Sequence, residues 1–140
     1  MNITKNFTLE ELIESDTADR EGFIEQYSPP VEVIENLKIL CINLLQPLRN
    51  LLPGVMIVSS GYRCKRLNSA VGSKDTSQHP KGQAADIQYF ENGEMKNKKL
   101  RDVLYTSGLE FDQCIDEHKG AWTHLSYNLN HNRKMNLTIN

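Results

Sequence analysis

The chain has 140 residues, of which 39% are hydrophobic and 24% charged, and its formal net charge is −2. This length allows one hydrophobic core, and the composition is that of an ordinary globular protein. Because the charges are scattered and nearly balanced, they argue against nucleic acid or an anionic membrane as the main partner.

The N-terminal part of the chain is predicted to be helical. Thr8 and Glu11 form a capping-box pattern that predicts a short helix from Leu9 to about Ser15. A polar loop follows. Apolar residues at helical spacing then predict a long helix from Val31 to about Leu52, which Pro47 is expected to kink or end.

The second half of the chain is predicted to consist of strands around one further helix. A buried strand is expected at residues 55–58, and others at 84–89, 109–117 and 121–127. Between them we expect a long loop with one helical turn near residues 64–70, and a helix at 95–107 that Gly108 ends. A short hairpin connection, His118-Lys119-Gly120, joins the last two strands.

Helices followed by a small, mostly antiparallel sheet predict an α+β fold. We expect a single domain over residues 1–140, with an Asn-rich tail from about residue 128 that is partly mobile. The three cysteines, Cys41, Cys64 and Cys114, have no paired spacing, which argues against a disulfide scaffold and against a thiolate zinc site.

The most informative stretch, residues 77–86, reads Ser-Gln-His-Pro-Lys-Gly-Gln-Ala-Ala-Asp. His79 ends a polar loop, and Asp86 falls on a predicted strand between two apolar residues. A bare carboxylate is costly in an apolar setting, and a bound cation would offset that cost. Gly82 and the two alanines before Asp86 leave space for the backbone to approach an ion closely.

A second stretch, Trp-Thr-His-Leu-Ser-Tyr, begins at residue 122, and strand alternation places Trp122, His124 and Ser126 on one face. His124, His79 and Asp86 would supply two imidazoles and one carboxylate, which suit one zinc ion with a fourth position for water. Zinc lowers the pKa of such a water to about 7 and so provides a nucleophile at neutral pH. On spacing alone, a structural histidine and an ion-paired or capping aspartate stay open as alternatives.

These residues resemble the metal signature of the M15 peptidases, in which Ser-x-His and a later Asp are followed by Trp-x-His. Other segments also resemble this family. Phe7–Leu12 resembles its opening segment, Ser59–Arg63 together with Asn68 resembles its Ser-Gly-Tyr-Arg…Asn loop, and Phe111–Gln113 resembles its late strand. The family comprises zinc D-Ala-D-Ala carboxypeptidases and related murein peptidases, often of bacteria and phages. The resemblance covers residues 7–127.

The resemblance implies a hedgehog- and D-Ala-D-Ala-carboxypeptidase-like fold with one zinc ion held by His79, Asp86 and His124. Several relatives carry an acid three residues before the last histidine ligand, where this chain has Ala121. The best remaining candidate for the catalytic base is Glu117, across the hairpin from His124 as in some relatives. Asp116, whose side chain is expected on the opposite face of the strand, is the second choice. The alternative that Glu117 is only an exposed turn residue stays open.

Further residues are implied to meet the substrate. Arg63 lies in the loop that the resemblance places beside the site, where its guanidinium could grip a substrate carboxylate or polarise the scissile carbonyl. Ser77 is expected to hydrogen-bond near the metal or the substrate. Gln78, Asn68 and Tyr62 are expected to shape the cleft, and Trp122 either forms a wall of the site or belongs to the core.

The sequence therefore predicts a zinc metallopeptidase, carboxypeptidase or endopeptidase, that hydrolyses peptidoglycan stem or cross-bridge peptides. We expect no nucleic acid partner, no membrane span and no obligate protein partner. A catalytically inactive, zinc-stabilised module that binds cell-wall peptides is the alternative, supported by Ala121, and a hydrolase of another amide stays open. Residues 1–12 lack a signal-peptide pattern, so we expect a protein that is cytoplasmic as synthesised and acts on the wall after release or lysis.

Overall fold

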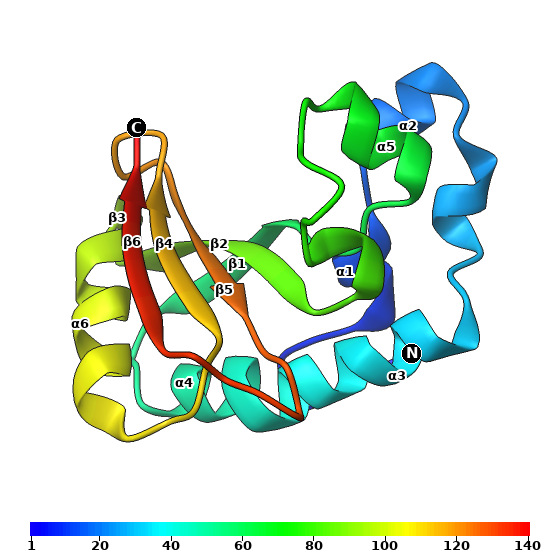
Figure 1. The fold of residues 1–140 in the computed structure, drawn as a ribbon. Coiled ribbons are helices and arrows are strands. Elements are labelled where there is room, and N and C mark those ends of the chain that lie inside the picture. Colours follow the sequence, from blue (N-terminus) through cyan, green and yellow to red (C-terminus); the bar gives the residue numbers. More distant parts are fainter.

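The computed structural model describes residues 1–140 and has an α+β fold, as the sequence predicts. Its sheet has six strands in the order β1-β2-β5-β4-β6, and the short β3 pairs with β2. The strands are β1 (Val55–Ser60), β2 (Ala84–Glu91), β3 (Glu94–Met95), β4 (Gln113–Glu117), β5 (Trp122–Ser126) and β6 (Met135–Ile139). All pairings are antiparallel except β4–β6, so the sheet is mixed (Figure 1).

The N-terminal segment contains more helix than predicted. The capping box of Thr8 and Glu11 is present and begins α1 (Leu9–Ile13). The polar loop expected next instead contains α2 (Asp16–Glu21) and the 3₁₀ helix η1 (Ile24–Tyr27).

Gln26 explains why this polar segment is ordered. Its side chain is completely buried, donates to the carbonyls of Ile13 and Tyr62, and accepts from the backbone N–H of Cys64. One amide thus satisfies three backbone groups from segments far apart in sequence, and it fixes the N-terminal helices against the loop after β1.

The long helix predicted from residue 31 continues past Pro47. It consists of α3 (Val31–Leu40), a π-helical stretch η2 (Cys41–Leu45) and α4 (Gln46–Asn50). A proline inside an α-helix clashes with the carbonyl four residues earlier, and the wider π turn just before Pro47 accommodates its ring. The regular α-helical pattern is thus interrupted just before Pro47, where the sequence predicts a kink or an end, and the helix resumes as α4.

Two of the remaining helices agree closely with the prediction. The helical turn in the long loop is α5 (Lys65–Ala70), whereas the 3₁₀ turn that follows it, η3 (His79–Lys81), was not predicted. Helix α6 (Asn97–Ser107) ends at Gly108, whose φ of 79° is the left-handed conformation typical of a helix C-terminus. The expectation that β1 is buried is wrong, because Val55 and Ile57 are 53% and 46% exposed on this edge strand.

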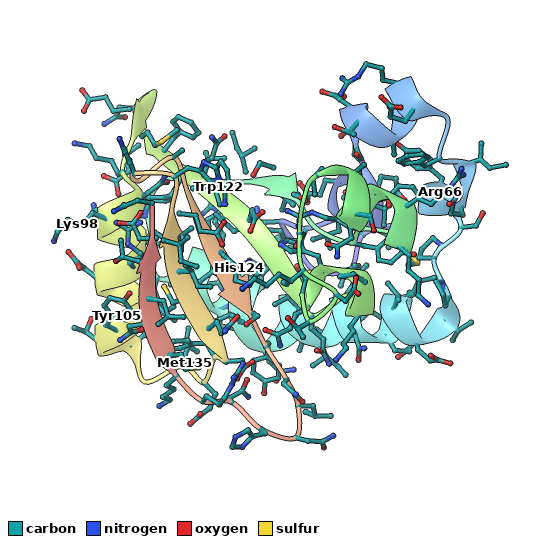
Figure 2. The ribbon with its side chains drawn as sticks, turned by 45° about the horizontal axis from the view of Figure 1, so that its top comes forward. Arg66, Lys98, Tyr105, Trp122, His124 and Met135 are labelled. Carbon is teal, nitrogen blue, oxygen red and sulfur yellow. The ribbon has the colours of Figure 1, made fainter.

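The two faces of the sheet have different surroundings. Helix α6 packs on one face, where Tyr105 contacts Cys114 and Arg101 reaches Thr123. Residues of α3, η2 and α4 join β2 and α6 in one hydrophobic core. Trp122 and His124 project from β5 on the side away from α6 (Figure 2). That second face carries the candidate site.

The C-terminal tail, expected to be partly mobile, adds a strand to the sheet. Arg133 forms two hydrogen bonds from its guanidinium, at 2.8 and 2.9 Å, to the buried carboxylate of Asp112, which also accepts from the Arg133 backbone N–H. This pairing directs residues 135–139 along β4 as β6. No helix of the structure combines the length and apolar character needed to cross a bilayer.

Candidate metal centre

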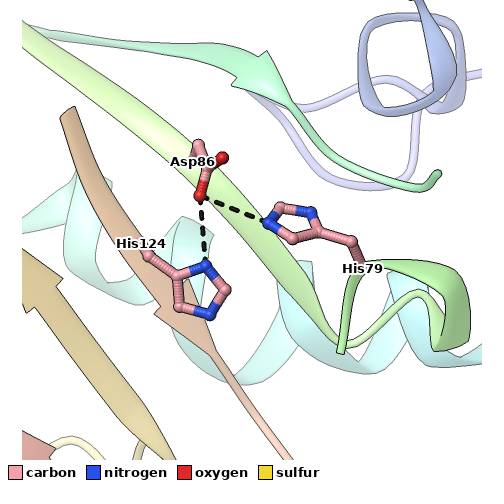
Figure 3. A group of neighbouring side chains, drawn as sticks. All are labelled: His79, Asp86 and His124. Atoms are coloured by element: carbon pink, nitrogen blue, oxygen red, sulfur yellow. Dashed lines mark hydrogen bonds and ion pairs between the residues drawn. The ribbon is translucent and has the colours of Figure 1, made fainter. Parts of the chain in front are cut away.

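Three elements bring the predicted ligands together. His79 begins η3, Asp86 lies on β2 and His124 lies on β5. Asp86 and His124 are directly paired across the β2–β5 ladder, so their side chains project from the same face of the sheet (Figure 3). The 3₁₀ turn of η3 directs His79 toward the same point.

The ligand atoms form a compact cluster. Asp86 Oδ1 lies 3.3 Å from His79 Nε2 and 3.1 Å from His124 Nδ1. One donor atom from each residue lies within 4.8 Å of the others, and all three side chains are buried. Two imidazole nitrogens and one carboxylate oxygen at this spacing fit a divalent metal such as zinc, with a further coordination position for water or substrate.

The ligands are held by a second layer of hydrogen bonds. His79 Nδ1 lies 2.6 Å from the carbonyl oxygen of Gly61. Because a carbonyl only accepts, the proton is on Nδ1, which leaves Nε2 free to bind a metal. Asp86 Oδ2 accepts from Arg63 Nη2 at 3.0 Å, and Arg63 Nε donates to Ser60 Oγ at 3.0 Å.

The charge of Asp86 suits a cation site. Burial alone would raise the pKa of Asp86, but the neighbouring imidazoles of His79 and His124 outweigh burial and hold that pKa well below its usual range. The carboxylate therefore stays ionised in a buried position, where positive charge must compensate it.

A β-bulge beside the centre was not visible in the sequence. The β1–β2 register shifts between Val58 and Ser60, so Ser59 is the extra residue. Ser59 Oγ donates to the carbonyl of Asp86, and Ser60 pairs with Asp86 and accepts from Arg63. The bulge therefore turns Ser60 toward the arginine that supports Asp86, a common use of bulges next to functional sites.

Gly61, whose carbonyl lies against the His79 ring, is packed closely against α1. A Cβ placed on Gly61 would lie 2.3 Å from the carbonyl oxygen of Leu12 in α1, so any side chain there forces backbone to move. Gly61→Ala should destabilise the protein by about 1–3 kcal/mol and, by displacing the carbonyl bonded to His79, weaken metal binding about 10–100-fold. Thermal unfolding and a competitive zinc titration measure the two effects.

Gly93→Ala provides the matched control for this prediction. Gly93 has a φ of 79° and open space around it, so alanine there is strained but lies in the β2–β3 turn, away from the ligands. It should lower the unfolding temperature and leave zinc affinity unchanged. Equal losses of zinc affinity in both variants would contradict the role given to Gly61.

The two candidate bases lie on opposite faces of β4. Glu117 Oε1 is 4.0 Å from His124 Nδ1, and Oε2 accepts from the indole Nε1–H of Trp122. Asp116 instead faces α6, where it pairs with Arg101 at 3.4 Å. Ala121, at the position where several relatives carry an acid, lies in the turn between β4 and β5. Among these positions only Glu117 presents a carboxylate to the ligand cluster.

Two hollows meet at the centre. A large cleft of about 870 Å³ lies on one side and includes Ser59, Trp122 and residues 14–17 after α1 in its lining. A smaller pocket of about 240 Å³ contains His79 and His124. Arg63, Ser73, Asp86 and Glu117 line both hollows, so the two hollows adjoin beside the cluster.

The residues predicted to contact substrate divide into two groups. Arg63, Ser77, Gln78 and Trp122 line one or both hollows. Ser77 also accepts from the His79 backbone N–H.

Tyr62 and Asn68 line neither hollow. Tyr62 is buried in the hydrophobic core, and burial raises the pKa of its hydroxyl. Asn68 is also buried, and its amide donates to the Lys74 carbonyl, which supports the loop carrying Ser73 and Ser77.

The comparison with known families agrees with this geometry. A family model described as Peptidase M15 matches residues 5–126. The matched segment includes the His-Asp-His cluster, Arg63 and Glu117, and it ends with the last residue of β5, so β6 lies beyond it. No curated protein matches the sequence.

Proposed function

Because the chain belongs to the peptidase M15 family, we propose that it is a zinc metallopeptidase that hydrolyses amide bonds in peptidoglycan peptides. The observation that carries this proposal is the buried cluster of His79, Asp86 and His124 at the junction of two hollows, with Glu117 beside it. A peptide lying across this junction would present one amide to the cluster and extend into the hollow on either side.

His79 Nε2, Asp86 Oδ1 and His124 Nδ1 would hold the ion. Zinc would supply a Lewis acid for the scissile carbonyl and a water with a pKa of about 7. Glu117, whose Oε1 lies 4.0 Å from His124 Nδ1, would serve as the base that takes a proton from the attacking water and delivers it to the departing amine nitrogen. All atoms of the reaction are accounted for, because the water adds its hydroxyl to the carbonyl carbon and its hydrogen to the departing amine.

Arg63 contributes positive charge beside the reacting carbonyl. Burial lowers the pKa of its guanidinium, and the nearby carboxylates of Asp86 and Glu117 oppose that shift. Its hydrogen bonds to Asp86 and Ser60 fix the side chain before substrate arrives, so its charge needs no reorganisation as the oxyanion forms. We expect Ser77 and Gln78, which line the smaller pocket, to hold the peptide there.

Digestion of purified muropeptides followed by mass spectrometry tests the proposal. We expect zinc-loaded protein to cleave a stem or cross-bridge amide, a metal chelator to stop cleavage, and added zinc to restore it. The masses of the products identify the bond and distinguish removal of a terminal residue from internal cleavage. Zinc-loaded protein that produces no cleavage of any muropeptide would contradict the proposal.

A second candidate is a zinc-stabilised module that binds cell-wall peptides without cleaving them. Ala121 favours it, because the acid that several relatives carry at this position is missing. Such a module would bind muropeptides in a calorimetric titration, would melt at a lower temperature after zinc removal, and would release no product.

A further inference from the structure

Trp122 makes a specific contact with the proposed base. It is the only tryptophan of the chain and is directly paired with Glu117 across the β4–β5 ladder. Its indole Nε1–H donates to Glu117 Oε2 at 3.1 Å. The contact is therefore polar and directed, a role beyond the two that the sequence suggested for this residue, a wall of the site or a part of the core.

The two oxygens of Glu117 have different partners. Oε2 is bonded to the indole, while Oε1 lies 4.0 Å from His124 Nδ1 and faces the ligand cluster. An indole N–H can only donate, so it can hold one oxygen of a carboxylate and cannot take a proton from it. The bond to Trp122 thus fixes the rotation of the carboxylate and leaves Oε1 toward the position where water would be activated.

The indole itself is held by the hairpin turn. The ring of His118 packs on the Trp122 ring with centroids 4.3 Å apart and an interplanar angle of 32°. His118 has a φ of 49°, a left-handed conformation that places its ring back over β5. Both rings line the large cleft beside Glu117.

We propose that Trp122 is a positioning residue for Glu117: its indole N–H orients the carboxylate so that Oε1 faces the metal centre. This role rests on the proposed function, in which Glu117 is the base. It assigns to Trp122 an effect on the rate of the chemical step and none on the affinity for the peptide.

Trp122→Phe tests this role because phenylalanine keeps an aromatic ring against His118 and removes the N–H. We expect kcat to fall about tenfold, as for the loss of one hydrogen bond to a charged group, with KM, zinc content and the unfolding temperature nearly unchanged. Tyr105→Phe is the matched control. It removes a hydrogen-bonding hydroxyl on the α6 face of the sheet and should leave kcat unchanged.

The double variant Trp122→Phe/Glu117→Gln separates an effect through Glu117 from a direct one. If Trp122 acts through Glu117, its substitution lowers kcat in the wild-type background and has no further effect when Glu117 is glutamine. A raised KM with unchanged kcat would show a substrate wall. Equal losses in both backgrounds, or loss of zinc, would show a purely structural role, and each of these results would overturn the proposal.

Failure of the proposed function gives a different result. If Glu117→Gln alone retains full activity, Glu117 is not the base, and the proposed mechanism and the role of Trp122 fail together. If Glu117→Gln is inactive while Trp122→Phe is as active as the wild type, only the inference about Trp122 fails.

Discussion

His124→Ala is expected to abolish hydrolysis and to prevent stable binding of zinc. The substitution leaves two protein ligands, His79 and Asp86, where catalytic zinc sites ordinarily have three. Loss of a ligand should weaken zinc binding by more than the roughly 10–100-fold that loss of a hydrogen bond behind a ligand costs. Without the ion, the reaction loses several kcal/mol of transition-state stabilisation, so the rate should fall by about a thousandfold or more.

Elemental analysis of the purified variant and a muropeptide cleavage assay measure these two effects. His131→Ala is the matched control, because His131 lies exposed in the C-terminal segment, outside the ligand cluster. The control should retain zinc and full activity. A His124→Ala protein with one zinc ion per chain and wild-type turnover would show that the metal centre has been placed wrongly.

Glu117→Gln should lower kcat by about 10²–10⁴-fold while zinc stays bound. Glutamine has nearly the shape of glutamate and can still accept the indole hydrogen bond, but it cannot take a proton from water. Glu117 lies outside the ligand cluster, so the affinity for metal should change little. Metal content and kcat, measured on the same preparation, separate loss of the base from loss of the ion.

Asp116→Asn distinguishes the two acids that the sequence left open. Asp116 faces α6 and pairs with Arg101, so its substitution should lower the unfolding temperature and leave kcat within a few-fold of the wild type. If kcat instead falls in Asp116→Asn and is maintained in Glu117→Gln, the assignment of the base must be reversed.

The parts of the fold that the sequence predicted well are those set by neighbouring residues. The capping box of Thr8 and Glu11 and the helix end at Gly108 depend on contacts within one helical turn, and both are present. Period-two alternation likewise assigned Glu117 and Asp116 to opposite faces of one strand.

The features that the sequence did not show depend on distant partners. Gln26 is buried because its amide forms hydrogen bonds with backbone groups 13, 36 and 38 residues away. Its neighbours in the sequence give no sign of these partners, so the sequence predicted a polar loop there. The bulge at Ser59 is defined only against β2, and β6 depends on the pairing of Arg133 with Asp112. Single-sequence patterns contain no information on such long-range pairings.

The candidate site shows the same division. His79, Asp86 and His124 were identified from their residue types and from the family resemblance, and the structure brings their donor atoms together. The supporting groups, Ser60 and the Gly61 carbonyl, were missed as such because their roles come from backbone geometry. A backbone carbonyl is present in every residue, so no sequence signal identifies the one that orients a histidine.

The direct pairing of Asp86 with His124 also bears on how the sheet reaches its correct alignment. A slip of one residue between β2 and β5 would bring Thr123 or Leu125 opposite Asp86 and turn His124 toward α6. In such a slipped sheet, the three donors could not meet around one ion. Metal binding at this cluster would therefore stabilise only the native alignment, and we expect zinc present during folding to favour correct strand pairing before any substrate is bound.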